Sequence, residues 1–256
     1  MLDHEYDTMR SVEDAYWWYQ ALRGSVVAEM ARLYPAGSPC RVLDAGCGTG
    51  GMMESLRRTN PEWDLAGIDI SPLAVAHTRQ RGFADVWAAG IDDIPCSDGA
   101  WDAVVCLDVL YHAAVDEPRA MTELFRVLRP GGHLLLNLPA FDCLAGGHDV
   151  AVQGARRYTT GGVERLLSRH GFRVRRLFYW NALMFPAVLI WRQLSRHRPA
   201  AAQPNAKSDL GALPGALNRA LLKLARLDIR VGRTLHLPFG TSVFAIADKP
   251  PPFSTA

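Results

Sequence analysis

A carboxylate and several glycines lie close together in the segment VLDAGCGTGG, which covers residues 42–51. Glycine lets the backbone approach a ligand closely and adopt positive φ without steric cost. A helix that begins after such a turn offers unpaired backbone N–H groups to a polar ligand. The segment therefore predicts a small-molecule site in which Gly46 and Gly48 line a turn directly after Asp44.

Asp44 distinguishes two interpretations of this turn. Gly46, Gly48 and Gly51 satisfy the pattern G-x-G-x-x-G and Asp69 follows 23 residues after Gly46, so a dinucleotide such as NAD is one candidate ligand. A carboxylate within about 5 Å of a pyrophosphate would cost on the order of a few kcal/mol. The same carboxylate suits the positive amino and sulfonium groups of S-adenosylmethionine, whereas Asp69 can hold the ribose of either ligand. We therefore expect S-adenosylmethionine as the cofactor, with S-adenosylhomocysteine as product, and keep an NAD(P)-dependent oxidoreductase as the alternative.

The elements that must position these residues follow from the alternation of short apolar runs with helix-like stretches. This alternation predicts parallel βαβ units, with strands over 41–45, 64–68, 84–88, 101–107 and 133–138. Pro130-Gly131-Gly132 is expected to separate a helix over 117–128 from the fifth strand. Beyond residue 138 we expect a loop over 139–154, a helix over 160–170, a strand over 173–180, a helix over 181–196, a flexible linker over 198–214, a helix over 217–233 and a strand over 241–247.

The composition narrows the class of protein. Apolar residues make up 49% and charged residues 21% of the 256 residues, which is typical of a globular protein. A net charge of +2 argues against a dedicated nucleic-acid binder. The five cysteines contain no C-x-x-C pair, so we expect neither a metal site nor a disulfide framework, and a cytoplasmic location. No apolar run reaches the roughly 20 residues that a transmembrane helix needs.

The motifs VLDAGCGTG, GIDIS, IDDIPCSDGAWDAVVCLDVLYH and LFRVLRPGGHLLLNLPA resemble those of class I S-adenosylmethionine-dependent methyltransferases over roughly residues 10–180. The resemblance implies an α/β fold with a doubly wound, Rossmann-like sheet of seven strands. The sheet is expected to be mostly parallel, with the last strand antiparallel and inserted between strands five and six. We expect one domain over 1–256, with N-terminal lid helices over 1–35, a core over 36–180, a helical cap over 181–235 and a final strand and tail over 236–256.

The resemblance also assigns the cofactor residues. It places Asp44, Gly46, Cys47 and Gly48 at the methionine end, Asp69 at the ribose, Ile70 with Gly90, Ile91 and Asp92 at the adenine, and Leu107 facing donor and substrate. It also implies that the N-terminal helix with Trp18 and Arg23 closes over the donor, with an aromatic over the sulfonium and Arg23 near the donor carboxylate; core packing of a lid is the alternative for these aromatics. Many relatives carry an acidic residue after the third strand, where this chain has Ala89-Gly90-Ile91. Asp92 or a backbone carbonyl is expected to take over the contact with the adenine amino group.

Four side chains are candidates for chemistry on the acceptor. Asp108 and His112 follow the fourth strand, and each could act as a base or serve only to order the loop. His148 and Tyr158 belong to a stretch that resembles HD…H-x-RRYT in one branch of the family, although the usual second histidine is missing near Gly154. They could form an acceptor pocket or merely a loop-to-helix junction.

The expected acceptor is a small and fairly apolar molecule, such as a secondary metabolite or a lipid-linked compound, methylated at oxygen, nitrogen or carbon. The apolar stretch over 178–191 precedes several arginines, so it could form a core or dimer helix, shape the acceptor pocket or touch a membrane surface. We expect a monomer or a homodimer. A catalytically silent protein that only binds S-adenosylmethionine is a further alternative.

Overall fold

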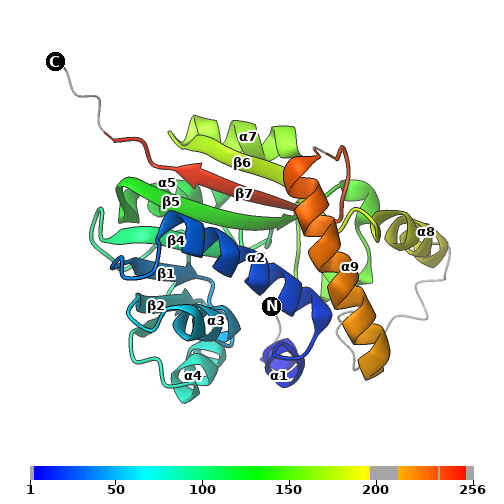
Figure 1. Ribbon diagram of the computed structural model, residues 1–256, viewed down its shortest axis with the longest axis horizontal. Coiled ribbons are helices and arrows are strands. Elements are labelled where there is room, and N and C mark those ends of the chain that lie inside the picture. Colours follow the sequence, from blue (N-terminus) through cyan, green and yellow to red (C-terminus); the bar gives the residue numbers. More distant parts are fainter. Residues whose placement is uncertain (1–2, 197–212, 236, 252–256) are drawn as a thin grey trace.

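The computed structural model describes residues 3–196, 213–235 and 237–251, and within them one seven-stranded sheet in the order β3-β2-β1-β4-β5-β7-β6 (Figure 1). Its strands are β1 (Arg41–Ala45), β2 (Asp64–Asp69), β3 (Val86–Ala88), β4 (Trp101–Leu107), β5 (Leu128–Pro139), β6 (Arg173–Trp180) and β7 (Ser242–Asp248). The first five strands pair in parallel, and β7 runs antiparallel between β5 and β6. The predicted fold class is confirmed, including the place of the last strand.

Helices cover both faces of this sheet. They are α1 (Asp3–Val12), α2 (Trp17–Leu33), α3 (Gly51–Thr59), α4 (Pro72–Gln80), α5 (Glu117–Val127), α6 (Gly147–Ala151), α7 (Thr160–Arg169), α8 (Phe185–Arg196) and α9 (Gly215–Thr234), with a 3-10 turn over Asp142–Leu144. Successive side chains of a strand point to opposite faces. In β4, Val104 and Cys106 therefore pack with α5 and α7, whereas Ala103 and Val105 pack with α2, α3 and α9. Burial on both faces explains why this strand is almost entirely apolar.

Three expectations about element boundaries were wrong. Pro130-Gly131-Gly132 does not separate α5 from β5, because the strand begins at Leu128 and absorbs these residues in an irregularity of its pairing with β4. The Gly131 N–H donates to the Lys249 carbonyl, which keeps the segment within the sheet. The helix expected from residue 181 begins only at Phe185, after Asn181 with φ of 59°. The loop expected over 139–154 contains α6.

The N-terminal segment forms two helices above the edge of the sheet where β1, β2 and β4 end. Helix α1 packs against α4, and Asp7 Oδ1 lies 3.0 Å from His77 Nε2. Helix α2 begins at Trp17 and packs against α3 and α9. Of the linker expected over 198–214, residues 198–212 lie outside the described residues.

Candidate functional site

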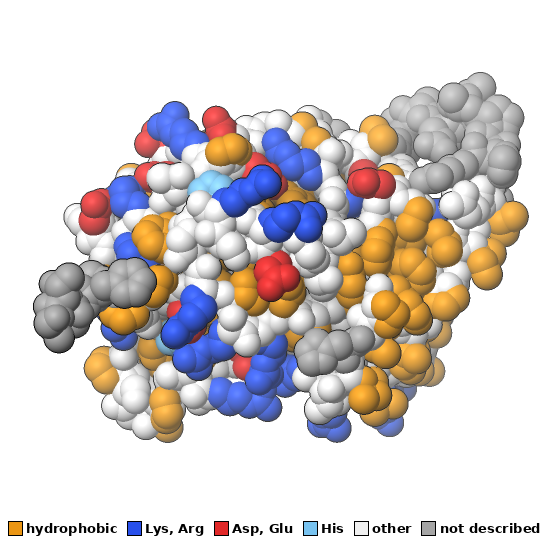
Figure 2. Space-filling view, turned by 90° about the horizontal axis from the view of Figure 1, so that it is seen from above, with side chains coloured by type: hydrophobic (Ala, Val, Ile, Leu, Met, Phe, Trp, Pro, Cys, Tyr) orange, Lys and Arg blue, Asp and Glu red, His pale blue; other side chains and the backbone are white. Residues whose placement is uncertain are grey.

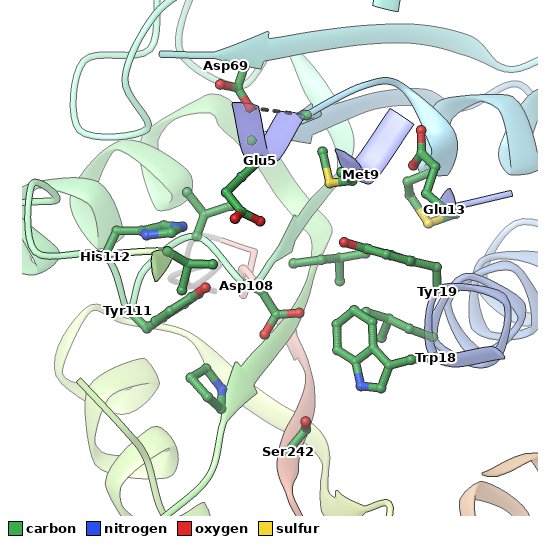
Figure 3. Close-up of a pocket in the computed structure, with 18 of the residues that line it drawn as sticks. Glu5, Met9, Glu13, Trp18, Tyr19, Asp69, Asp108, Tyr111, His112 and Ser242 are labelled. Carbon is green, nitrogen blue, oxygen red and sulfur yellow. Dashed lines mark hydrogen bonds between the residues drawn. The ribbon is translucent and has the colours of Figure 1, made fainter. Parts of the chain in front are cut away.

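A cavity of about 570 Å³ lies at the carboxyl ends of β1, β2 and β4, beneath α1 and α2 (Figure 3). Ligands of open α/β sheets bind at this edge. Every residue predicted to bind the cofactor lines the cavity: Trp18, Arg23, Asp44, Gly46, Cys47, Gly48, Asp69, Ile70, Gly90, Ile91, Asp92 and Leu107. Asp108 and His112 also line it. Strand ends that are far apart in the sequence therefore bring the expected residues together in one space.

The backbone of the glycine-rich turn adopts a conformation that favours glycine. Gly46 has φ of 92° and Gly48 has φ of 53°, backbone angles that L-residues with a side chain rarely adopt. A Cβ on Gly46 would lie 2.2 Å from Val109 Cγ2, and one on Gly48 would lie 2.8 Å from Met9 Cε. Gly46 is therefore required both by its backbone conformation and by the approach of Val109, whereas Gly48 is favoured mainly by its backbone conformation, because the Met9 side chain is flexible.

Asp44 carries a buried carboxyl group. The residue is only 3% exposed, and its Oδ2 has no hydrogen-bond partner among the described residues. Burial, and then the nearby carboxylates of Asp69 and Glu13, raises the pKa of Asp44 to about 8. An isolated buried carboxylate is costly, and a cationic ligand removes that cost. The residues present thus fit a ligand that carries positive charge beside the turn.

The Asp69 carboxylate is held in a fixed position at the end of β2. Its Oδ2 accepts the Gly48 N–H at 2.9 Å, and its Oδ1 accepts the Ser71 N–H at 2.9 Å and the Tyr6 hydroxyl at 3.0 Å. Burial is the largest influence and raises the pKa of Asp69, while these hydrogen bonds oppose it. Helix α1 therefore reaches directly to the residue expected to hold the ribose.

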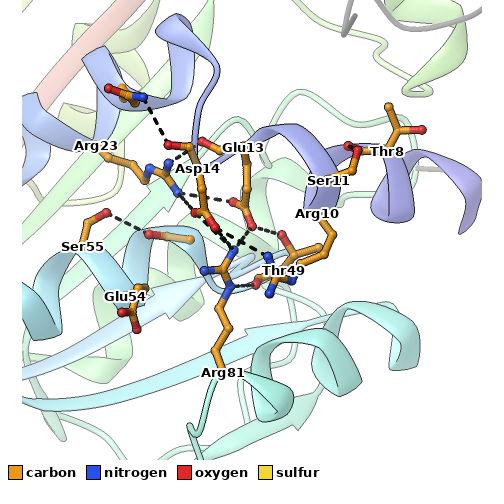
Figure 4. A network of polar contacts seen from close by, with 12 residues as sticks. Thr8, Arg10, Ser11, Glu13, Asp14, Arg23, Thr49, Glu54, Ser55 and Arg81 are labelled. Atoms are coloured by element: carbon orange, nitrogen blue, oxygen red, sulfur yellow. Dashed lines mark hydrogen bonds and ion pairs between the residues drawn. The ribbon is translucent and has the colours of Figure 1, made fainter. Parts of the chain in front are cut away.

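Arg23 belongs to a network that joins the α1–α2 junction to the glycine-rich turn (Figure 4). Its Nη1 lies 3.5 Å from Glu13 Oε2 and 3.4 Å from Asp14 Oδ1. The other Glu13 oxygen, Oε1, accepts the Thr49 hydroxyl and lies 2.6 Å from Arg81 Nη2. The guanidinium expected near the donor carboxylate thus already pairs with a carboxylate of the chain itself.

Sequence reasoning did not identify Glu13 or Arg81. Arg81 Nε also donates to the Thr49 carbonyl at 2.7 Å, so this arginine ties the end of α4 to the turn. Both residues belong to charged stretches without a motif, and only the fold brings them together. No signal in the sequence would have singled them out.

Aromatic side chains form the wall of the cavity beneath α2. Trp18 stacks on Trp180 with 5.9 Å between ring centroids, and Tyr19 meets Trp18 edge-on at 5.2 Å. Figure 3 shows Trp18 and Tyr19 beside each other, facing the space around Asp108. An electron-rich aromatic wall of this kind favours a bound cation.

Among the residues expected at the adenine, Ile70 is 68% exposed and Asp92 is hydrogen-bonded within the chain. Asp92 Oδ2 accepts the Asp116 N–H at 3.3 Å. The remaining Asp92 oxygen, Oδ1, lies 2.4 Å from the position of a Cβ on Gly90. A glycine at position 90 therefore lets the Asp92 carboxylate turn back over the loop.

Asp108 has the properties of a base at the centre of the cavity. Its φ of 54° places it in the left-handed region, which aspartate tolerates better than most residues. Burial raises the pKa of Asp108 to about 7, against the lowering influence of the Asn137 amide and of Arg157. Asn137 Nδ2 donates to Asp108 Oδ2 at 2.8 Å, and Trp180 Nε1 donates to Asn137 Oδ1 at 2.8 Å. Catalytic bases are most effective with a pKa near the working pH.

His112 lies beside Asp108 but is a weaker candidate. Burial lowers the pKa of His112 to about 4, so the imidazole is neutral at pH 7. Its ring stacks on Tyr111 with 4.3 Å between centroids, and its Nδ1 has no hydrogen-bond partner among the described residues. A group with so low a pKa gains little from accepting a proton near neutrality.

The other two candidates occupy different positions. Tyr158 is not among the residues that line the cavity, and its hydroxyl donates to Glu117. The backbone of His148 belongs to α6, but its side chain lies outside what the structure describes. Arg157 lines the cavity and pairs with Asp149 at 2.7 Å. At position 154, a Cβ would lie 2.7 Å from the Tyr111 ring, so the glycine there allows Tyr111 to approach.

Comparisons with known proteins agree with this geometry. Residues 43–136 match the family model described as a methyltransferase domain. The chain is 35% identical over 121 residues to a malonyl-[acyl-carrier protein] O-methyltransferase of Pectobacterium atrosepticum, a match that covers 45% of this chain and 43% of the relative. It is 36% identical over 114 residues to a ubiquinone biosynthesis O-methyltransferase of Xanthomonas axonopodis pv. citri, covering 42% and 45%. The chain therefore spans less than half the length of these curated relatives.

The fold extends beyond the matched segment. A Haloferax volcanii protein solved in complex with the Trm112 methyltransferase activator has a TM-score of 0.61 and 18% identity, over 96% of this chain and 98% of that one. At this identity the similarity concerns the fold alone. Residues 43–136 are thus similar to a methyltransferase domain, and the whole chain shares the fold of the solved neighbour.

Proposed function

We propose that this protein transfers a methyl group from S-adenosylmethionine to a small, fairly apolar acceptor. One observation carries the proposal: Asp44 is a buried carboxylate beside the glycine-rich turn, with an oxygen that has no partner among the described residues. A second carboxylate, that of Asp69, lies close enough to raise the pKa of Asp44 further. A cation beside these carboxyl groups would lower the pKa of Asp44 and be paired with its ionised form, whereas a pyrophosphate would be repelled by any ionised carboxylate there, which counts against the dinucleotide alternative.

S-adenosylmethionine supplies an electrophilic methyl group when bound, and the chain supplies its alignment and a site from which water is excluded. Asp44 and Gly46 would hold the methionine end, and Asp69 the ribose. Arg23 is the nearest cation for the donor carboxylate, once Glu13 releases it. Helix α1 would cover the bound donor, because Tyr6 and Met9 line the cavity.

Asp108 would accept the proton of an oxygen or nitrogen acceptor. Its carboxylate is aimed into the cavity and is held by Asn137, which fixes its direction. With a pKa of about 7, a substantial fraction of Asp108 is ionised near neutrality, so proton acceptance is available without a large energetic cost. The names of the curated relatives, both O-methyltransferases, favour oxygen as the methylated atom.

The acceptor pocket is expected between Asp108 and α8. Leu144, Val152 and Val188 line this part of the cavity together with Tyr111 and Trp18, so the walls are mainly apolar. Such walls suit a small organic molecule better than a nucleic acid, which needs an extended basic surface. Arg157 and Arg192 supply the positive charge there. We further propose a cytoplasmic location, which five free cysteines suit, and a monomer or homodimer.

Calorimetry with one matched pair of variants tests the donor site. Asp69→Ala should weaken S-adenosylmethionine binding by about 1.5–3 kcal/mol, the scale for hydrogen bonds to a charged group. Asp64→Ala, at the exposed opposite end of the same strand, should bind like the wild type. Tight binding of NAD in place of S-adenosylhomocysteine would overturn the proposal, and unchanged affinity in Asp69→Ala would overturn the ribose assignment.

A further inference from the structure

Helix α8 presents hydrophobic side chains on two opposite faces. Val188 and Arg192 line the cavity on the inner face. On the outer face Leu183, just before the helix, is 51% exposed, Ile190 61%, Trp191 56% and Leu194 65%. Within the helix, Leu194 follows Ile190 by four residues and Trp191 by three, which places these three side chains along one side of α8. Exposed side chains of this size gathered in one place mark an interaction surface.

Helix α9 extends the same surface. Leu217, Leu227 and Leu235 are about half exposed, and Phe239 after the helix is 38% exposed. The buried Asp228 of α9 accepts the Leu183 N–H at 2.9 Å, which ties the start of α8 to α9. Figure 2 shows hydrophobic side chains gathered at the end of the molecule where Figure 1 places these two helices. We call the exposed side chains of α8, α9 and their flanking residues the α8–α9 surface.

Exposed cations lie along α9, one of the two helices of this surface. Arg219, Lys223, Arg226 and Arg230 are exposed along α9, and none of them pairs with an acidic side chain within the described ranges. The only acidic residue of the described parts of α8 and α9 is Asp228, which is 2% exposed. A second copy of the chain docked through its own α9 would bring these cations face to face with like charges. An anionic surface would instead be attracted to all four cations.

We infer that the α8–α9 surface docks on an anionic lipid bilayer and that an amphiphilic acceptor enters the cavity from that side. Apolar side chains that include a tryptophan, flanked by lysine and arginine, are the composition that binds at the boundary between headgroups and acyl chains. No described helix is both long and apolar enough to cross a bilayer, so the contact is peripheral. The inference of a bilayer contact depends only on the surface residues described above, whereas the entry of an acceptor rests on the proposed function.

The geometry connects the two faces of α8. Because one helix contributes Val188 to the cavity and Ile190 and Trp191 to the outer surface, a bilayer at the outer face lies one helix diameter, about 10 Å, from the cavity. An acceptor with an apolar tail could keep the tail in lipid while its polar head reaches toward Asp108. This narrows the substrate class from small apolar molecules to amphiphiles that partition into membranes.

Sedimentation with vesicles tests the contact. The full chain should bind vesicles of phosphatidylglycerol and phosphatidylcholine and should not bind vesicles of phosphatidylcholine alone. Lys223→Glu combined with Arg226→Glu should weaken binding by at least roughly fivefold for each charge reversed, and high salt should do the same. Ile190→Ser combined with Trp191→Ser should abolish binding. Trp87→Ser, at an exposed aromatic on β3, and Arg165→Glu on α7 are the matched controls and should bind like the wild type.

Two results would overturn the inference. One is a lack of binding to anionic vesicles, or binding that the surface variants leave unchanged. The other is a stable dimer, measured by light scattering, that Ile190→Ser with Trp191→Ser converts to a monomer, because a second copy would then cover the surface. All variants should bind S-adenosylhomocysteine normally, since none of these residues lines the cavity. A failure of donor binding in the wild type would contradict the proposed function and leave the vesicle result standing.

Discussion

The hydroxyl of Tyr6 donates a 3.0 Å hydrogen bond to Asp69 Oδ1, across 63 positions of the sequence. The same carboxylate accepts the backbone N–H groups of Ser71 and Gly48. Since a carboxylate offers roughly four acceptor positions, little capacity remains for the two hydroxyls of a ribose. On the proposed assignment of Asp69 to the ribose, the Tyr6 hydroxyl would compete with the ligand for this carboxylate.

Tyr6→Phe should therefore raise the affinity for S-adenosylhomocysteine. Removing the competing hydroxyl leaves the ring and its packing in place, and the gain should be about 0.5–1.5 kcal/mol, the net value of one hydrogen bond. Titration calorimetry measures it directly. Ser11→Ala, which removes an exposed hydroxyl that donates to the Thr8 carbonyl on the same helix, serves as the control. Weaker binding in Tyr6→Phe would show that the hydroxyl contacts the ligand instead of competing with it.

Asp44→Asn should make the ligand-free protein more stable and bind the donor less well. The pKa of Asp44 is raised to about 8 in the folded protein, against about 3.9 in the unfolded chain. The folded state consequently binds the extra proton, and this contribution to stability is present below pH 4 and lost as the pH rises through 8. The amide of the Asp44→Asn variant carries no charge and so avoids the cost of a buried ionised carboxylate. The free energy of unfolding of the variant should therefore exceed that of the wild type by about 1–3 kcal/mol at pH 8 and by little at pH 4.

Chemical denaturation at several pH values, with and without S-adenosylhomocysteine, tests both parts of this prediction. The wild type should lose stability between pH 4 and pH 8 more steeply than Asp44→Asn, and its added stabilisation by ligand at pH 8 should be larger. Asp64→Asn, an exposed carboxylate on β2, is the control and should follow the wild type. Equal pH dependence in wild type and Asp44→Asn would contradict the unpaired carboxylate.

The sequence predicted those parts of the site that depend on strand ends. Asp44 and Asp69 each close an apolar run, and the parallel order of β1 and β2 brings the ends of such runs to one edge. The alternation within β4 likewise follows from burial on both faces. The place of Pro130 within β5 was not predictable, because proline and glycine are tolerated where pairing is irregular.

Contacts of the lid could not be predicted, because they join residues with no shared pattern. Glu13 contacts Thr49 and Arg81, and each of these pairs is separated by more than 30 positions. For Tyr158, by contrast, a sequence motif suggested a place in the acceptor pocket. In the structure its hydroxyl donates a hydrogen bond to Glu117, which does not favour that role. The direction of the side chains that follow β5 depends on the packing of the Tyr111 ring against Gly154. Local sequence propensities do not predict this packing.

Asn137→Leu should raise the pKa of Asp108. The Asn137 amide donates to the Asp108 carboxylate and lowers its pKa, so removing this donor should move the titration of Asp108 about one pH unit higher. Nuclear magnetic resonance of protein labelled with ¹³C-aspartate reports this titration without an acceptor. Trp180→Phe, which removes the hydrogen bond to Asn137 but leaves the amide in place, should give a smaller change.

The same pair of variants tests the role of Asp108 once an acceptor turns over. As a base, Asp108 must be ionised, so kcat/KM should fall as the pH drops through about 7 in the wild type. In Asn137→Leu this decline should begin at higher pH. If Asn137→Leu left the pH dependence of kcat/KM unchanged, proton transfer to Asp108 would be excluded. Methylation at carbon, without a base at this position, would then be favoured.

Gly46→Ala and Gly24→Ala should have opposite effects on stability. At position 46, φ is 92° and a Cβ would lie 2.2 Å from Val109 Cγ2, so the turn must distort. We expect a loss of more than about 2 kcal/mol together with the loss of measurable donor binding. At Gly24, which is exposed within α2, a Cβ meets nothing within 4 Å. There alanine should stabilise the protein by about 0.5–1 kcal/mol, because it restricts the unfolded chain more than glycine does. Thermal unfolding and calorimetry of the two variants distinguish a glycine required by the ligand site from one that the helix merely tolerates, and a Gly46→Ala protein that binds the donor normally would contradict the close approach of the turn.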